Sequence, residues 1–214
     1  MTRKRLSTED FIADLARAPV PKPFAASSIA LWTSAATALG VALWLSLMGL
    51  RPDLGTALSA PVTLAKTGLP ALLSVSALWL AIRSAYPGKG LRLSYLLLPP
   101  AMALVLIADA AAATPAPFLT QAMVGSTAMK CLSAVLGLSL LPIAAGLTFL
   151  KNGASTNPAL SGALLGLAAG AGAAAGYSLA CTEDSPLFYV VWYGLAIASA
   201  GGVGSLAGSR LLRW

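Results

Sequence analysis

Long apolar stretches separated by short polar turns dominate the chain from residue 27 onward. Six of them are long enough to cross a bilayer as a helix, which takes about 18 or more residues. They cover residues 27–50, 68–86, 94–113, 127–150, 159–181 and 187–206. Each stretch is continuous, whereas the strands of a membrane β-barrel alternate in polarity over about ten residues. The pattern therefore predicts an all-α fold, a polytopic membrane bundle of six transmembrane helices.

The composition supports this interpretation and excludes several function classes. Of the 214 residues, 57% are hydrophobic and 10% are charged, and the mean hydropathy is +0.80. Soluble domains have about 45–50% apolar and about 25% charged residues. The chain has no histidine, the commonest general base and metal ligand, and we expect no enzymatic activity. The net charge of +7 comes without a basic cluster interleaved with aromatic residues, so we expect no direct contact with nucleic acid.

Lysine and arginine are distributed unequally between the two sides of the predicted bundle. An even number of spans puts both termini on one side, and that side carries 11 of the 14 basic residues. These are Arg3, Lys4, Arg5, Arg17, Lys22, Arg83, Lys89, Arg92, Lys151, Arg210 and Arg213. The opposite side carries Arg51, Lys66 and Lys130. Because basic loops are retained in the cytoplasm, both termini are predicted to be cytoplasmic.

Residues 1–24 form the one sizeable polar segment, which we separate from a transmembrane domain at residues 25–214. Ser7 can cap a helix and Asp10 can answer it three residues later, while Pro21 and Pro23 end the segment. Leu6, Phe11, Ile12 and Leu15 share one face of that helix, and Asp10, Asp14 and Arg17 point away from it. Two interpretations are open: a helix that lies on lipid headgroups, or a helix that docks in the groove of a soluble partner.

The predicted topology brings several polar residues to the non-cytoplasmic face. Asp109 lies near the outer end of the third span, and Cys131 lies about one turn into the fourth. Cys181, Glu183 and Asp184 close the fifth span on the same side, where Arg51 and Asp53 follow the first span. Both thiols and all the carboxylates beyond the N-terminal segment are therefore expected at one depth.

Two cysteines at an oxidising face have three plausible chemistries. They could be inert small apolar residues, they could form a disulfide, or they could bind a thiophilic metal ion, zinc or cadmium-like. Asp109, Glu183 and Asp184 could complete the shell of such an ion. Two thiols 50 positions apart are a weak metal motif compared with paired CxxC sequences, so the spacing leaves the choice open. No cofactor is required; a metal ion would act as a signal.

Asp109 needs its own explanation, because a carboxylate inside a span is costly. A structural ion pair with Lys130 or Arg51 is one interpretation, and a part in sensing or in a proton path is the other. The second would suit an alternative function, a small transporter or channel. Phe188, Tyr189, Trp192 and Tyr193 are expected to form an aromatic belt at the interface.

Glycines at four-residue spacing mark close helix contacts in the last two spans. Gly162, Gly166 and Gly170 recur in this way within alanine-rich sequence, and the sixth span ends in a similar glycine-rich stretch. We expect packing within the bundle rather than between copies, although a homo-oligomer is a second option.

The chain as a whole resembles the NrsF family of six-span anti-sigma factors. The resemblance rests on the segment at residues 8–15, the Arg-Pro-Asp-Leu sequence at 51–54, Cys131 at the start of the fourth span, the run at 177–184 and the ending at 208–214. It implies a multi-pass protein of the bacterial inner membrane that holds an extracytoplasmic-function sigma factor inactive and releases it under heavy-metal or oxidative stress. Cys131 and Cys181 would be the sensing thiols. Asp10, Phe11, Ile12, Asp14 and Leu15 would be the natural contact to the sigma factor.

Overall fold

The computed structural model describes residues 7–17, 25–88 and 90–212, and this part of the chain consists of helices joined by turns. The α-helices within these ranges are α1 (Thr8–Arg17), α2 (Ala26–Met48), α3 (Leu54–Ser59), α4 (Pro61–Ser84), α5 (Leu98–Ala113), α6 (Leu119–Val124), α7 (Ala128–Leu150), α8 (Pro158–Tyr177) and α9 (Pro186–Leu211). Short 3-10 turns precede α5 and α6, at Leu93–Leu96 and Ala116–Phe118. Six helical segments of the described residues are long and apolar enough to cross a membrane. The predicted all-α, six-span class is confirmed.

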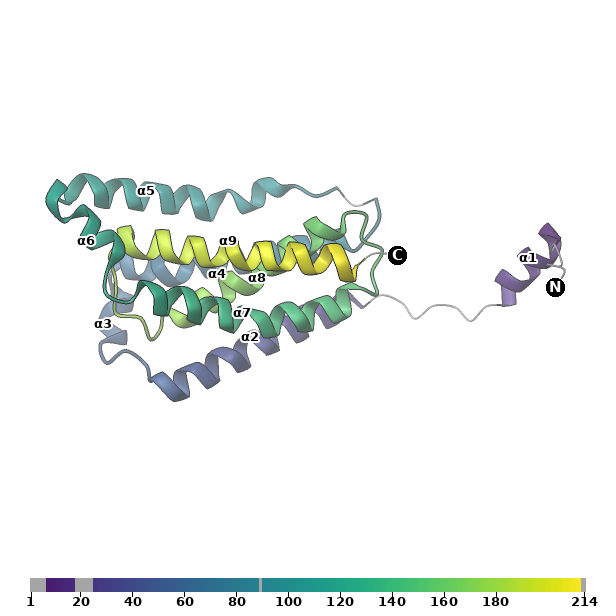
Figure 1. Ribbon diagram of the computed structural model, residues 1–214, viewed down its shortest axis with the longest axis horizontal. Coiled ribbons are helices and arrows are strands. Elements are labelled where there is room, and N and C mark those ends of the chain that lie inside the picture. Colours follow the sequence, from purple (N-terminus) through teal and green to yellow (C-terminus); the bar gives the residue numbers. More distant parts are fainter. Residues whose placement is uncertain (1–6, 18–24, 89, 213–214) are drawn as a thin grey trace.

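Helix α8 is the centre of the bundle. It packs on α9 and α4 most extensively and also contacts α7 and α2. In Figure 1, α4, α8 and α9 form the middle of the bundle, with α5 on one side and the pair α2 and α7 on the other. Within their most apolar windows, α8 is 61% buried by the protein and the span that contains α5 only 6%. Helix α5 is therefore a peripheral helix, and the core is built around α8.

Backbone-to-backbone contact joins α8 to α9 along a seam of small residues. A methyl group built on Gly162 would lie 2.2 Å from the carbonyl oxygen of Gly204, and one on Gly166 would lie 2.2 Å from that of Ala200. Gly208 also lies against Gly162. Only glycine permits this approach, which brings many backbone atoms into van der Waals contact. Such contact stabilises helix association in a membrane, where the hydrophobic effect does not drive helices together. The prediction that these glycines pack within the bundle is confirmed.

Several helix ends differ by a few residues from the predicted spans, and two of these differences affect the residues near Cys181. Helix α4 begins at Pro61 rather than at residue 68, with the proline in its first turn, where a missing N–H is tolerated. Lys66 therefore lies inside the helix, and it is fully buried. Helix α8 ends at Tyr177, so Cys181 lies in the turn beyond it rather than in the last turn of the helix. A prediction from hydropathy ends a span next to a charged residue such as Lys66. In the folded protein, packing determines where each helix begins and ends.

The N-terminal helix forms as predicted. Asp10 donates its backbone N–H to the Ser7 hydroxyl at 3.1 Å, and the Asp10 carboxylate accepts from the Ser7 hydroxyl at 2.8 Å and from its backbone N–H at 3.3 Å. This reciprocal capping fixes the first turn of α1. The predicted helix end at Pro21 and Pro23 lies outside the described residues, as do Leu6 and the basic residues Arg3, Lys4, Arg5, Lys22, Lys89 and Arg213.

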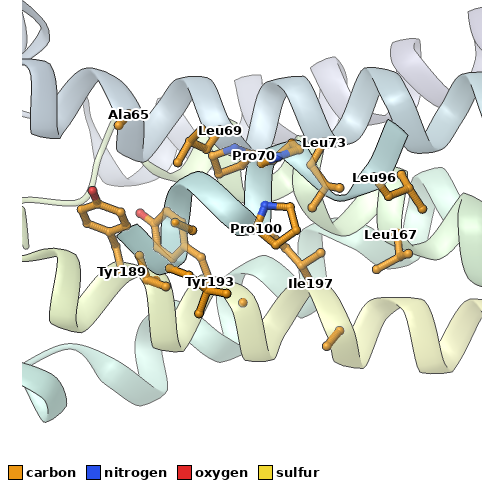
Figure 2. A pocket seen from close by; sticks show the side chains of 16 residues that line it. Ala65, Leu69, Pro70, Leu73, Leu96, Pro100, Leu167, Tyr189, Tyr193 and Ile197 are labelled. Carbon is orange, nitrogen blue, oxygen red and sulfur yellow. The ribbon is translucent and has the colours of Figure 1, made fainter. Parts of the chain in front are cut away.

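The expected aromatic belt on α9 is wrong for three of its four members. Phe188, Tyr189 and Tyr193 are at most 3% exposed and pack in the interior of the bundle. The two tyrosines form one end of an apolar cavity of about 430 Å³ between α4, α5 and α9 (Figure 2). Aromatic residues near a span edge resemble a belt in sequence, but here the start of α9 turns them inward, toward Cys181.

Candidate functional site

Both cysteines lie in one buried core at the end of the bundle where α2 ends and α4, α7 and α9 begin; we call this the thiol end. Cys131 is fully buried and Cys181 is 5% exposed, and both are free thiols. They share one cluster of buried side chains with Tyr177, Phe188 and Tyr193. The structure therefore brings together two sulfurs that are 50 positions apart in sequence.

The local structure explains how each thiol reaches this core. Cys131 lies in the first turn of α7, where its backbone N–H donates to the carbonyl of Thr127 at 2.8 Å. Cys181 follows the last turn after α8 and donates its N–H to the Tyr177 carbonyl at 3.2 Å. The hydroxyl groups of Tyr177 and Tyr193 lie beside Cys181. The first turn of α7 and the turn after α8 thus present the two thiols to one apolar and aromatic cluster.

Two cations hold the main chain of Cys181. Lys66 donates its Nζ to the Cys181 carbonyl at 2.7 Å, and Arg51 donates a guanidinium N–H to the same oxygen at 3.2 Å. The backbone N–H of Arg51 donates to the Leu179 carbonyl at 3.1 Å. The last carbonyls of a helix lack partners within it and carry partial negative charge. Lys66 from α4 and Arg51 after α2 supply donors and positive charge at the end of α8.

Asp184 joins the two cations. Its carboxylate accepts from two guanidinium nitrogens of Arg51, at 2.8 Å and 2.7 Å, and from Lys66 at 3.1 Å. This paired geometry is the strongest that arginine makes with a carboxylate. We call Arg51, Lys66, Asp184 and the Cys181 carbonyl the outer clamp. It connects the end of α2, through Arg51, and helix α4, through Lys66, to the turn that carries Cys181 and Asp184.

Asp53 lies beside the outer clamp but not within it. Its carboxylate accepts from Arg51 at 2.8 Å and 2.9 Å, and its side chain is 56% exposed, compared with 34% for Asp184. Hydrogen bonds from Arg51 hold the pKa of Asp53 below its usual range. Burial raises the pKa of Asp184, but hydrogen bonds from Arg51 and the charge of Lys66 outweigh it, so this pKa is also lowered. The pKa of Arg51 is raised, chiefly by its hydrogen bonds to Asp184 and Asp53.

Glu183 fastens the same turn to the start of α7. Its carboxylate accepts from the hydroxyl of Ser126 at 2.7 Å and from the Ser126 backbone N–H at 3.0 Å. The residue before Ser126, Gly125, has a φ of 57° and lies against the ring of Phe188, so no side chain fits there. The turn that carries Cys181 is therefore tied to α2, α4 and the α6–α7 connection by polar contacts.

The carboxylates predicted as additional metal ligands are engaged elsewhere. Asp184 binds Arg51 and Lys66, Glu183 binds Ser126, and Asp109 is exposed on the peripheral helix α5. No three cysteine or acidic side chains of the described residues converge on a point suited to a metal ion. The two thiols are therefore the part of the predicted ligand set that lies together in this arrangement. They suit a soft ion better than zinc, whose sites usually have four ligands.

The expected ion pair between Asp109 and Arg51 does not form, because Arg51 binds Asp184 and Asp53 instead. Among the described residues Asp109 also forms no ion pair with Lys130. The sequence places Asp109 at the correct end of the bundle, but the face of α5 that carries it turns away from the protein.

Lys66 is the site residue that sequence reasoning missed. It was assigned to an outer loop together with Arg51, and neither was linked to Cys181. One signal was available, since Lys66 follows the apolar residues Leu64 and Ala65 and stands only two positions before the predicted start of a span. A lysine at a span edge is usually solvated by headgroups, so this signal alone does not indicate a buried partner.

The predicted partner-binding residues on α1 present an apolar face to solvent. Phe11, Ile12 and Leu15 are 54%, 55% and 59% exposed, and α1 buries none of its residues. Asp10 caps the helix, and Asp14 lies one turn further along it.

Comparisons with known proteins give a consistent result over almost the whole chain. The family model described as "NrsF: Negative regulator of sigma F" matches residues 15–214. A probable anti-sigma-F factor NrsF of Azospira oryzae is 34% identical over 217 residues, covering 98% of this chain and all of that protein. An anti-sigma-F factor NrsF of Caulobacter vibrioides is 30% identical over 216 residues, again covering 98% of this chain and all of the relative. No solved structure matches the chain significantly.

Three findings agree with one another: the described residues include six helices long and apolar enough to cross a membrane, the two thiols lie together at one end, and the family match runs through every one of these helices to residue 214. Negative regulators of this kind are regulatory proteins, not enzymes. The chain belongs to the NrsF family.

Proposed function

We propose that this protein is a membrane-bound anti-sigma factor, which holds a sigma factor of the extracytoplasmic-function class inactive and releases it under heavy-metal or oxidative stress. The observation that carries the proposal is the near-full-length similarity to two proteins named as anti-sigma-F factors. The location would be the inner membrane, with both termini in the cytoplasm, as the distribution of basic residues predicts.

The contact to the sigma factor is assigned to α1. A helix of ten residues has little stability by itself in water, so α1 needs a surface to pack against. Its apolar face suits a groove on a partner protein. Phe11, Ile12 and Leu15 would enter the groove, while Asp10 and Asp14 would stay at its rim. The family model begins within α1, at residue 15, while both relatives align over 98% of this chain.

The signal is assigned to Cys131 and Cys181. A thiophilic cation such as cadmium would bind both sulfurs as thiolates and displace two protons. Alternatively, hydrogen peroxide would accept two electrons and two protons from the thiols, which leaves a disulfide and two waters. Either product joins α7 to the turn after α8. A switch from 1:99 to 99:1 requires a preference of about 5.5 kcal/mol between the two states, which a covalent or two-thiolate bond can supply.

The direct test is binding and release with purified components. The full-length protein in nanodiscs is mixed with each extracytoplasmic-function sigma factor of its source organism, and binding is measured with and without cadmium chloride or hydrogen peroxide. We expect one sigma factor to bind, to lose access to core RNA polymerase, and to dissociate on treatment.

Two variants separate the parts of this proposal. A double replacement Phe11→Ser and Leu15→Ser should abolish binding, whereas Cys131→Ser with Cys181→Ser should bind normally but fail to release. A sigma factor that binds equally well to a protein lacking residues 1–17 would move the contact to the loops. Release that persists without both cysteines would overturn the sensing role.

A further inference from the structure

The outer clamp is the polar connection between Cys181 and the helices that lead away from it. Its three side chains come from α4 and from the segments that follow α2 and α8, so they are far apart in sequence. Lys66 is fully buried and the Arg51 side chain is 4% exposed. Ionisable side chains buried in a membrane protein are costly and usually functional. A buried ion pair also adds little net stability compared with apolar packing, so the clamp needs an explanation beyond holding the fold.

Its position suggests what it does. The Cys181 carbonyl accepts from both cations, so a movement of Cys181 displaces the atom that Lys66 and Arg51 share. Arg51 also holds the Leu179 carbonyl through its own backbone N–H. A bridge between the two sulfurs would join Cys181 to the first turn of α7, which carries Cys131. Any displacement of Cys181 that such a bridge causes would reach Arg51 and Lys66 first, because both bind its carbonyl oxygen.

Helix α2 is the element that such a displacement would free. It ends three residues before Arg51, and its other end follows α1 after residues 18–25 in the sequence. Between α2, α4 and α8 lies a cavity of about 270 Å³, lined by the hydroxyl residues Thr33, Ser34, Thr37 and Ser74 and by Gly172 and Gly176. Helix α2 packs closely on α8 at Gly176, where a methyl group would lie 2.2 Å from Val41, but the cavity leaves the space beside Thr33 and Ser74 unfilled. Helix α2 therefore has room to shift on that side once the end that leads to Arg51 is released.

We infer that Arg51, Lys66 and Asp184 are positioning residues that hold Cys181 in the resting geometry and couple it to α2, so that opening of this clamp is the step between the thiols and α1. This inference rests on the proposed function, because it describes how the signal at the thiols leaves the site. The resting state keeps the clamp closed, and a sulfur bridge favours the open state. A ligand shifts such an equilibrium only through its different affinity for the two states.

The test compares two carboxylates that bind the same arginine. Asp184→Asn removes the charge inside the clamp, and Asp53→Asn removes the charge outside it, with the same change in shape. In full-length protein in nanodiscs we expect Asp184→Asn to weaken sigma-factor binding roughly tenfold or more without any metal or oxidant, since a buried charge left unpaired shifts an equilibrium by at least that factor. Asp53→Asn should bind as the parent protein does.

A destabilised control separates positioning from folding. Leu147→Ala removes a side chain that is 3% exposed at the opposite end of the bundle, so it lowers stability without touching the clamp. We expect it to retain sigma-factor binding after correction for folded protein. The charge-retaining variant Asp184→Glu should restore part of the binding that Asp184→Asn loses. If Leu147→Ala releases the sigma factor as Asp184→Asn does, the effect is loss of folding and the clamp proposal is overturned.

A second measurement does not need the sigma factor. In a Cys131→Ser background, the rate at which N-ethylmaleimide alkylates Cys181 reports how firmly that residue is held. Asp184→Asn should raise this rate severalfold and Asp53→Asn should leave it unchanged. An equal rate in both variants overturns the clamp even if sigma-factor binding is confirmed. Failure of the parent protein to bind any sigma factor, with the expected difference in alkylation, refutes the proposed function but not the positioning role.

Discussion

The seam between α8 and α9 and the thiol end are held together in opposite ways. Along the seam, backbone atoms touch at glycine positions, and no charged side chain takes part. At the thiol end, Arg51, Lys66 and Asp184 reach across from separate segments through long side chains. Backbone packing has one arrangement, since nothing in it can rotate or exchange partners. Side-chain contacts to a carbonyl can break and reform, so the adjustable part of this molecule is the thiol end.

The largest effect should come from breaking the seam. Gly166→Val adds an isopropyl group whose Cβ alone would lie 2.2 Å from the Ala200 carbonyl oxygen, so α8 and α9 must separate. We expect a loss of stability above about 3 kcal/mol, the upper end for overpacking, because backbone cannot move aside as a side chain does. Unfolding in mixed micelles, followed by circular dichroism, measures this loss.

Gly202→Ala is the matched control for the seam. It lies on α9, the other helix of the seam, but a methyl group there meets nothing within 4 Å. A change within about 0.5 kcal/mol is expected, as for substitutions away from packed contacts. If Gly202→Ala and Gly166→Val destabilise equally, glycine is needed for helix flexibility and not for the close approach of α8 to α9.

Much of the scaffold could be predicted because its signals are local. The capping pair Ser7 and Asp10, the four-residue spacing of Gly162 and Gly166, and the lengths of the spans are all contained in short windows of sequence. The outer clamp is different, since Lys66 lies 115 positions from Cys181 and Arg51 lies 133 positions from Asp184. Topology places these residues at one end of the bundle, but it does not determine which way each helix faces. The same ambiguity explains why Asp109 was expected to pair with Arg51.

The second largest effect should come from removing Asp184, the carboxylate that Arg51 and Lys66 share. In Asp184→Ala the two buried cations Lys66 and Arg51 remain side by side, and their like charges repel each other. Removing one member of a buried ion pair costs about 3–5 kcal/mol, and we expect the lower end because Asp184 is partly exposed. The same micelle unfolding measurement gives the value. A loss under half of that would mean that lipid headgroups or water replace the carboxylate.

A smaller effect is expected from Lys66→Met. The methionine fills a similar volume, the Cys181 carbonyl keeps its hydrogen bond from Arg51, and Asp184 keeps both guanidinium contacts. The loss of one hydrogen bond on each acceptor, offset by removal of a buried charge, should cost about 1 kcal/mol. An equal cost for Lys66→Met and Asp184→Ala would show that Lys66 contributes as much to the clamp as Asp184 does, contrary to this prediction.

The smallest effect should be that of mild acid. The pKa of Asp184 is lowered in the folded protein, so its contribution to stability is fully present above the ordinary aspartate value of about 3.9 and is lost as the pH falls through the lower folded value. The pKa of Asp53 is lowered as well, and the chain has no histidine that could titrate nearer neutrality. The contribution of the clamp to the free energy of unfolding should therefore be constant between pH 5 and pH 8, and it should decline below about pH 4.

Comparing the parent protein with Asp184→Asn isolates the loss of stability in acid that is due to Asp184, because the asparagine side chain has no carboxylate to protonate. The difference in stability between the two should be constant above pH 5 and should shrink toward acid, since the parent loses its charged carboxylate there. A difference that already shrinks between pH 7 and pH 5 would mean that Asp184 is protonated far more easily than its contacts with Arg51 and Lys66 imply. The thiol end would then respond to pH as well as to chemistry at sulfur, and its contrast with the uncharged α8–α9 seam would be greater still.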